Sequence, residues 1–399
     1  MYDLANQFFA MNVISLYFPR WLTIVKGMPE IGYSITFGIS MFFVSIAAPI
    51  WGTVSDLHAN KRQLLVFSTL VSVIFTVLIG ISSNVFLALI FFAVANFGCQ
   101  IAGVFYNALM VHVTPPNKTG VVSGVGRMFA YLGALLAISL TKPVMAKWGY
   151  EATFVITGVY FLLFSLPVMI FVDEPKSKTI PLSQCFSFQL AQKIFGAIKN
   201  SFKESKAMRD FRILLKFIFW GSCAINTMIL FMSVLVGQLF SLNEGQIADL
   251  LIFGSAFGVL GSVLSGWAGD RFGYKLSLTV VFGVWFLTFL GAMMGKPGQE
   301  KIIAALIGLG LGATYTLTRA WVVHLVPGKN IGEVFGLFNL AGYCSSIVGP
   351  VIFGLVLWNF RFLGIDKYRI GLISLLVFVL ISFYYLFQLP ESSGKKYAA

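Results

Sequence analysis

Long runs of apolar residues recur along the chain and alternate with short polar segments. Each run is close to the roughly 20 residues that a helix needs to cross a bilayer, which argues against a barrel of short strands. The first run carries no basic leader and no cleavage site, so we expect it to stay in the mature protein. We predict twelve membrane-spanning helices, at residues 2–25, 34–57, 63–82, 85–111, 120–142, 151–173, 210–240, 247–269, 275–295, 301–325, 332–358 and 368–389.

The composition agrees with a chain that is built for lipid. Of its 399 residues, 58% are hydrophobic and 11% are charged, against roughly 25% charged residues in a soluble domain. The net charge of +13 does not indicate nucleic-acid binding, because no soluble module gathers the basic residues into one surface. If the amino terminus is cytoplasmic, most of the 28 Lys and Arg residues fall in the predicted inside loops. We therefore expect a multi-pass protein of the inner or plasma membrane with both termini in the cytoplasm.

The longest polar segment divides the spans into two sets of six. We predict an amino-terminal bundle at 1–173, a cytoplasmic linker at 174–209 and a carboxy-terminal bundle at 210–399. Within the linker, apolar residues recur at helical spacing and lysines occupy the positions between them. This pattern favours an amphipathic helix on the anionic cytoplasmic leaflet, where it either only orients the chain or also regulates it.

The two halves of the chain repeat each other. Gly52-Thr-Val-Ser-Asp56 recurs as Gly266-Trp-Ala-Gly-Asp270, and Val111-His-Val-Thr-Pro115 recurs as Val323-His-Leu-Val-Pro327. The shift is 214 residues for the first pair and 212 for the second, which indicates a duplication. Because an even number of helices separates the copies, both halves have the same orientation. This arrangement resembles the parallel repeat of major facilitator carriers.

The loop after the eighth predicted helix resembles the loop signature of the major facilitator superfamily. It reads Gly266-Trp-Ala-Gly-Asp270-Arg271-Phe-Gly273-Tyr-Lys275. Glycines allow a tight turn and close backbone approach, and a carboxylate beside cations can form a charge relay that fastens one conformation. We predict a cytoplasmic latch made of Gly266, Asp270, Arg271, Gly273 and Lys275, with a weaker copy at Gly52, Asp56, Lys61 and Arg62. Orientation of the chain by these basic residues is the simpler alternative.

Polar residues inside spanning helices are costly, so a stripe of them usually faces protein or a water-filled cavity. In the architecture that the resemblance implies, the first, fourth, seventh and tenth helices line such a cavity. Polar residues recur on one face of these helices and at matched positions of the fifth and eleventh. Packing is an equally good reading of any single Asn or Tyr. We predict that the substrate-cavity residues are Asn6, Asn12, Asn96, Gln100, Tyr106, Asn107, Arg127, Tyr131, Asn226, Tyr315, Arg319, Asn339 and Tyr343.

Three charged residues in predicted spans add candidate chemistry. Arg127 and Arg319 cannot lose their charge, so each needs an anion, a cavity or a route to the interface. Either they hold a carboxylate or phosphate of the substrate, or they pair internally with Asp3 or Glu333. Asp3 either carries a coupled proton or caps the first helix, where Asp is common.

Several short motifs, in order along the chain, resemble those of the vacuole effluxer family. They are Tyr2-Asp-Leu-Ala-Asn6, Phe105-Tyr-Asn-Ala-Leu109, Ser123-Gly-Val-Gly126, Leu317-Thr-Arg319, and Val334 to Phe338 with Gly349-Pro350 and Phe353-Gly354. The resemblance implies efflux of small solutes such as amino acids. Leu4, Arg127 and Ala320 depart from the family pattern, and Arg127 favours an anionic or zwitterionic substrate.

Together these patterns predict an all-α membrane protein of twelve spanning helices that moves a small solute by alternating access. A lysolipid or lipid-like carrier is the alternative, because the chain holds 41 Phe and little charge near the predicted cavity. Neither a nucleophile with its base nor a phosphate loop is present in the sequence, so we do not expect an enzyme. Cys99, Cys185, Cys223 and Cys344 are scattered and indicate neither metal nor disulfide. We expect a monomer in contact with membrane lipid, with a small-molecule substrate, possible proton coupling at Asp3 and no cofactor.

Overall fold

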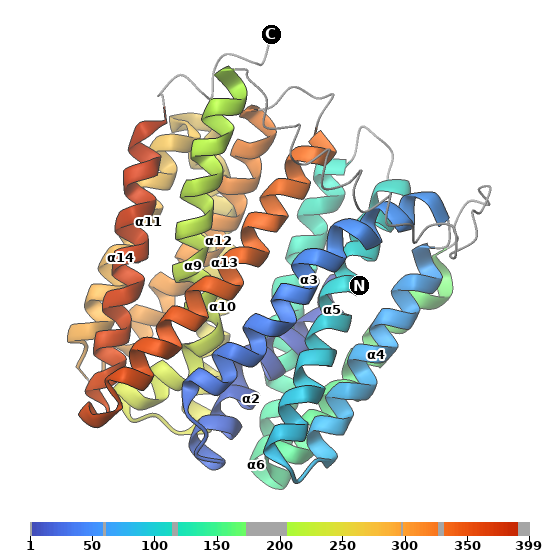
Figure 1. Cartoon of the computed structure of the whole chain (residues 1–399), viewed down its shortest axis with the longest axis vertical. Helices are drawn as coiled ribbons and strands as arrows, with labels where there is room; N and C mark the ends of the chain where they lie inside the picture. Colours follow the sequence, from blue (N-terminus) through green and yellow to red (C-terminus); the bar gives the residue numbers. More distant parts are fainter. Residues whose placement is uncertain are drawn as a thin grey trace. The chain divides into compact units, whose positions relative to one another are not determined.

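The protein is almost wholly helical in the computed structural model, which describes residues 2–58, 61–113, 119–172, 206–296, 298–325 and 331–389 (Figure 1). Within these residues, 11 helices are long and apolar enough to cross a membrane. One of them, Phe129–Phe171, has 43 residues, about twice the length of one crossing. Its backbone leaves helical geometry at Gly149, where φ is 79°. The predicted twelve spans are therefore confirmed, whereas residues 174–205 of the predicted linker helix lie outside the described residues.

The chain divides into two compact units, residues 1–28 with 36–197 and residues 29–35 with 198–399. Among the described residues, the helices that begin before residue 200 are α1 (Tyr2–Phe9), the π-helix η1 (Ala10–Leu16), α2 (Tyr17–Arg20), the π-helix η2 (Trp21–Val25), α3 (Glu30–His58), α4 (Lys61–Ile81), α5 (Val85–Val113) and α6 (Thr119–Phe171). Those that follow are α9 (Lys206–Phe240), α10 (Glu244–Phe272), α11 (Tyr274–Met294), α12 (Glu300–Leu325), α13 (Ile331–Asn359), the short 3₁₀ helix η5 (Arg361–Leu363) and α14 (Asp366–Gln388).

The helices pack in the same scheme in both units. In the first unit, α1 packs on α6, and α4 packs on both α5 and α6. In the second unit, α9 packs on α13 and α14, and α11 packs on both α12 and α14. Because α6 contains two crossings, these pairs correspond one to one. The repeat seen in the sequence is thus a repeat of packing as well.

The first crossing is irregular. It contains two π-helical segments, Ala10–Leu16 and Trp21–Val25, which flank the single α-helical turn of α2. A π segment widens the helix and is frequent at functional sites. The corresponding helix of the second unit, α9, is α-helical over its whole length. The two repeats therefore differ in their first helix.

The first turns of α3 group with the second unit and carry a buried carboxylate. Glu30 has 6% of its surface exposed and accepts hydrogen bonds from the Lys367 ammonium at 2.8 and 3.0 Å and from the Tyr368 hydroxyl. A buried charge is tolerated only when it is paired and hydrogen-bonded, and Glu30 meets both conditions. Its partners both lie in the first turn of α14.

Glycines allow α10 and α12 to pack with their backbones in contact. A Cβ added at Gly308 would collide with the Gly254 carbonyl oxygen, and one at Gly312 would collide with that of Gly258. Small residues four apart let spanning helices approach closely, where hydrocarbon gives no other driving force. These two glycines of the tenth predicted helix therefore serve packing.

We expect Gly312→Ala to destabilise the protein. Alanine gains about 1 kcal/mol in a helix interior, but an overpacked contact costs about 1–3 kcal/mol or more, and the Gly258 backbone cannot move aside. Gly283→Ala in α11 is the matched control, since an added Cβ there meets no atom within 4 Å. Thermal unfolding of the purified variants should show a lower midpoint for Gly312→Ala alone, and equal midpoints would contradict the packing assignment.

Candidate functional site

One face of α1 in the first unit is polar and partly accessible. Asp3, Asn6 and Gln7 are half-buried, whereas Leu4 and Ala5 between them are buried. Residues three and four apart share a face of a helix, so the three polar side chains form one row. Asp3 lies in the first turn of α1, where the helix dipole favours a negative charge.

Hydrogen bonds tie this polar row to α5. The Tyr106 hydroxyl donates to Asp3 Oδ2 at 2.7 Å, and the Cys99 thiol donates to Asn6 Oδ1 at 2.8 Å. On the same helix, Gln100 is half-buried and Asn107 is exposed. The structure thus brings together the predicted residues Asp3, Asn6 and Tyr106, and flanks them with two accessible amides of α5.

Asn12 and Asn96 are instead buried inside the first unit, with none of their surface exposed. The Asn12 amide donates to Thr157 Oγ1 at 3.2 Å and accepts from the Thr141 hydroxyl at 3.1 Å, so it joins the first crossing to both halves of α6. The Asn96 amide donates to Ser40 Oγ of α3 at 2.9 Å. Both side chains hold helices together in this structure.

The remaining predicted residues of the first unit lie on α6. Tyr131 is half-buried there. Arg127 falls within the helix, but its side chain lies outside the described part of the chain.

In the second unit, the predicted cavity residue Arg319 contacts an aromatic ring. The Arg319 guanidinium of α12 lies 5.8 Å from the centre of the Phe335 ring of α13, a cation–π contact. Tyr315, one turn before Arg319, has 38% of its surface exposed. Along α13, Asn339 is exposed and Tyr343 half-buried, four and eight residues after Phe335. Arg319, Tyr315, Asn339 and Tyr343 therefore present one cationic and three polar groups.

Asn226 of α9 plays the part in the second unit that Asn12 plays in the first. Its amide donates to Ser345 Oγ at 3.0 Å and to Ser346 Oγ at 2.8 Å, both on α13. The side chain is half-buried. An asparagine in the first helix of each unit therefore binds the hydroxyls of later helices.

The predicted latch of the second unit forms a tight turn between α10 and α11. Gly273, with φ of 89°, separates the two helices, a conformation that favours glycine. Close packing falls at Gly269 and not at Gly266, because a Cβ at Gly269 would lie 2.7 Å from Leu317, whereas one at Gly266 or Gly52 meets only ordinary contacts at 3.8 Å.

The charges of this turn are engaged with aromatic rings. Exposed Asp270 accepts a hydrogen bond from the Tyr274 hydroxyl at 3.1 Å. The Arg271 guanidinium lies 5.2 Å from the centre of the Trp267 ring and 5.6 Å from that of Phe272. Among the described residues, no ion pair joins Asp270 to Arg271. The Asp56 side chain lies outside those residues, so the relay stays a prediction.

Arg62 and Lys275 each cap the carboxy-terminal end of the sixth crossing in their unit. Arg62 donates through Nε to the Met169 carbonyl at 2.7 Å, and through its two other nitrogens to the carbonyls of Ile170 and Val172 at 3.2 Å. Lys275 Nζ donates to the Leu389 carbonyl at 2.5 Å. The last carbonyls of a helix lack partners within it, and cations there are favourable. Lys61, next to Arg62, is itself buried.

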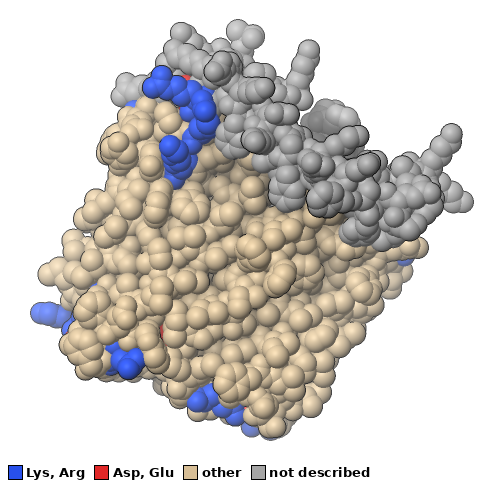
Figure 2. Space-filling model, in the orientation of Figure 1, with Lys and Arg blue, Asp and Glu red and all other residues tan. Residues whose placement is uncertain are grey.

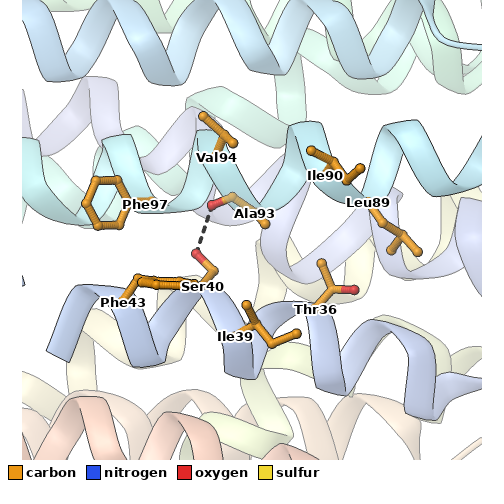
Figure 3. Close-up of a pocket in the computed structure, with 9 residues that line it drawn as sticks. All are labelled: Thr36, Ile39, Ser40, Phe43, Leu89, Ile90, Ala93, Val94 and Phe97. Atoms are coloured by element: carbon orange, nitrogen blue, oxygen red, sulfur yellow. Dashed lines mark hydrogen bonds between the residues drawn. The ribbon is translucent and has the colours of Figure 1, made fainter. Parts of the chain in front are cut away.

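An apolar pocket of about 440 Å³ lies between α3 and α5 in the first unit (Figure 3). Its two polar lining residues are Thr36 and Ser40, and the Ser40 hydroxyl already donates to the Ala93 carbonyl at 2.9 Å. The rest of its lining is apolar: Ile39, Phe43, Leu89, Ile90, Ala93, Val94 and Phe97. The pocket suits a hydrocarbon group better than a charged one.

Two repeated bundles of spanning helices with accessible polar faces define a membrane transporter, and the comparisons agree. The sequence profile of the Major Facilitator Superfamily matches residues 4–300 and 215–398. The chain belongs to this superfamily. Its predicted fold is confirmed by the crystal structure of the nucleoside transporter NupG, which it matches with a TM-score of 0.73 at 14% identity over 98% of both chains.

Two curated relatives are more similar in sequence. The uncharacterized MFS-type transporter YxiO of Bacillus subtilis is 25% identical over 378 residues, which cover 88% of this chain and 86% of the relative. Autophagy-related protein 22 of Vanderwaltozyma polyspora is 23% identical over 380 residues, which cover 80% and 71%. The chain is thus a multi-pass transporter of the superfamily.

Sequence reasoning missed several residues of these sites. Cys99 was assigned no role from the sequence, but its thiol donates a hydrogen bond to Asn6. The contacts of Phe335 and of the two serines that accept hydrogen bonds from Asn226 could not be predicted, since Phe and Ser are common in spanning helices. The position of Cys99 one residue before Gln100 placed it beside the polar face of α5, and this was the one available signal.

We expect Arg62→Gln to lower the stability of the protein by about 1–3 kcal/mol, because hydrogen bonds to charged groups are worth about that much and the site is partly solvated. Arg62→Lys should recover part of the loss, since an ammonium cannot reach all three carbonyls at once. Arg271→Gln is the control, because Arg271 is exposed and stacks only on rings. Thermal unfolding checks this, and equal midpoints for Arg62→Gln and Arg271→Gln would refute the capping role.

Proposed function

We propose that this chain is a secondary active transporter that exports an amino acid or another zwitterionic or anionic metabolite by alternating access. One observation carries the proposal: the polar row of the first unit holds a half-buried carboxylate, Asp3, which suits the ammonium group of an amino acid. Within the second unit, the half-buried guanidinium of Arg319 is a charge that suits a carboxylate. Amides and phenols beside both charges supply further hydrogen bonds to a small polar solute.

The contact between Asp3 and Tyr106 supplies a route to proton coupling. An ionised carboxylate strengthens the hydrogen bond that it accepts, since charge-assisted bonds are about twice as strong as neutral ones. Protonation of Asp3 therefore weakens the tie between α1 and α5 and removes the charge that attracts a substrate ammonium. A proton and an ammonium group would compete for the same oxygen atoms, which is what an exchanger requires.

Vacuole-effluxer membership is part of the proposal. It draws on the Tyr2 to Asn6 and Leu317 to Arg319 motifs and on the likeness to Autophagy-related protein 22.

We further propose that both termini are cytoplasmic, that the protein is a monomer of the inner or plasma membrane, and that Asp270 and Arg271 latch one conformation. The excess of Lys and Arg in the predicted inside loops supports this orientation.

A lipid-like or lysolipid substrate is the second candidate. The apolar pocket between α3 and α5 favours it, because a volume of about 440 Å³ lies within the range of small-ligand sites, roughly 300–1,000 Å³. It lies beside Asn96, whose Oδ1 has no hydrogen-bond partner among the described residues. The amino-acid proposal takes precedence, because the opposite charges of Asp3 and Arg319 have no part in binding a hydrocarbon chain.

The test is release of a labelled amino-acid mixture from proteoliposomes that hold the purified protein, with and without an imposed pH gradient. We expect release to exceed that of empty liposomes and to rise with the gradient. Asp3→Asn should abolish the gradient dependence, because the variant has no proton to carry. Asp366→Asn is the matched control, since Asp366 is exposed and bound to Arg369 at 2.7 Å.

Two results would count against the proposal. No release above empty liposomes by folded protein would remove amino acids as substrates, and transfer of labelled lysophosphatidylcholine in the same vesicles would then favour the lipid-like carrier. Gradient-driven release that persists in Asp3→Asn would leave the transport function standing but would remove Asp3 as the proton carrier.

A further inference from the structure

The first two turns of α9 in the second unit carry a row of exposed cations. Arg209, Arg212 and Lys216 are all exposed, and their spacing of three and four residues places them on one face of the helix. Figure 2 shows Lys and Arg side chains gathered over this end of α9. We call these three residues the α9 basic face.

These cations lack anionic partners within the described part of the chain, whose ion pairs are Lys367 with Glu30 and Arg369 with Asp366. The Lys216 ammonium lies 5.5 Å from the centre of the Tyr385 ring of α14, a contact with no charge to neutralise it. Like charges one turn apart destabilise a helix. The described part of the chain thus supplies no anion to the α9 basic face.

The depth of the α9 basic face points to a membrane anion. Lys216 lies seven residues after Arg209 on α9, about 10 Å along the helix axis. A row of that length exceeds the thickness of one headgroup layer, about 5–8 Å, so it can reach from the water to the edge of the hydrocarbon. A cation at that depth needs an anion or must extend its side chain back toward water. A soluble anion would reach Arg209 more readily than Lys216.

An apolar surface lies on the neighbouring helix. Five large residues of α14 have 45 to 62% of their surface exposed and recur on one face: Ile373, Val377, Leu380, Tyr384 and Phe387. We call them the α14 apolar stripe. Helices α9 and α14 pack together, and Trp220 lies 5.8 Å from Phe378 where they meet. Tyr385, which receives Lys216, is the chain neighbour of Tyr384 in the stripe.

We propose that the α9 basic face and the α14 apolar stripe form a binding site for one anionic phospholipid. The phosphate binds the guanidinium groups of Arg209 and Arg212, which suit bidentate contact with phosphate oxygens. The Lys216 ammonium binds the inner side of the headgroup, and the acyl chains lie along the stripe. The charge bias of the chain places this end of α9 at the cytoplasmic leaflet, where anionic lipids give the surface its negative potential.

The test measures thermal unfolding of the full chain in neutral detergent, titrated with dioleoylphosphatidylglycerol. The lipid should raise the unfolding midpoint of the natural sequence. Each Lys or Arg near an anionic membrane surface contributes about fivefold in binding. Replacing all three cations by Gln should therefore shift the titration to concentrations on the order of a hundredfold higher.

The control removes the same charge elsewhere, through Lys147→Gln, Lys296→Gln and Lys301→Gln. All three lysines are exposed, and this variant should respond to the lipid like the natural sequence. Arg209→Lys with Arg212→Lys should keep only part of the response, because the charge remains but the bidentate contact with phosphate is lost. If the triple Gln variant does not fold, Arg212→Gln alone should show a shift of about fivefold.

Three results would overturn the proposal. Equal stabilisation of the triple Gln variant and its control would show that phosphatidylglycerol binds elsewhere. Equal stabilisation by dioleoylphosphatidylcholine would show that the site does not select a net negative lipid. Stabilisation by glycerol phosphate alone, without acyl chains, would show that the α9 basic face binds a soluble anion.

Discussion

Hydrocarbon offers no hydrogen bonds, so a polar group buried in a span must find its partner within the protein. Asn12 meets this constraint by binding Thr141 and Thr157, and Asn226 does so by binding two serines of α13. In both units these amides fix the first crossing to later helices. Asp3 and Arg319 are half-buried, and the proposed function assigns them to the solute.

The same constraint explains the basic residues that the signature loops contain. Arg62 and Lys275 give the last carbonyls of α6 and α14 the partners that the membrane interface supplies poorly. A basic residue that follows the Gly-Asp motif thus has the same structural task in both repeats. A latch between conformations would rest on the neighbouring Asp270 and Arg271, whose contacts with aromatic rings are near the surface and easier to exchange.

The spans were predictable from the sequence because their length follows from the thickness of the bilayer. The duplication was equally visible, since two separate motifs recur at nearly the same shift, 214 and 212 residues. The facing of each side chain was harder to predict. Gly308 and Gly312 pack on α10 because of tertiary contacts that the sequence does not reveal. Asn12 points into the bundle because it lies in a π-helical segment, where the helical period changes. Asp3, Asn6 and Tyr106 were predicted as site residues, and the structure places them together.

The proposed alternating access requires the two units to move relative to each other during transport. Spin-label distances test it in proteoliposomes, in a variant without native cysteines. One pair of labels would sit at Lys147 and Lys301, in different units, and one at Lys301 and Arg369, both in the second unit. An amino-acid mixture with a pH gradient should shift the distance distribution of the first pair and leave the second unchanged. A first pair that stays fixed under all conditions would contradict the account.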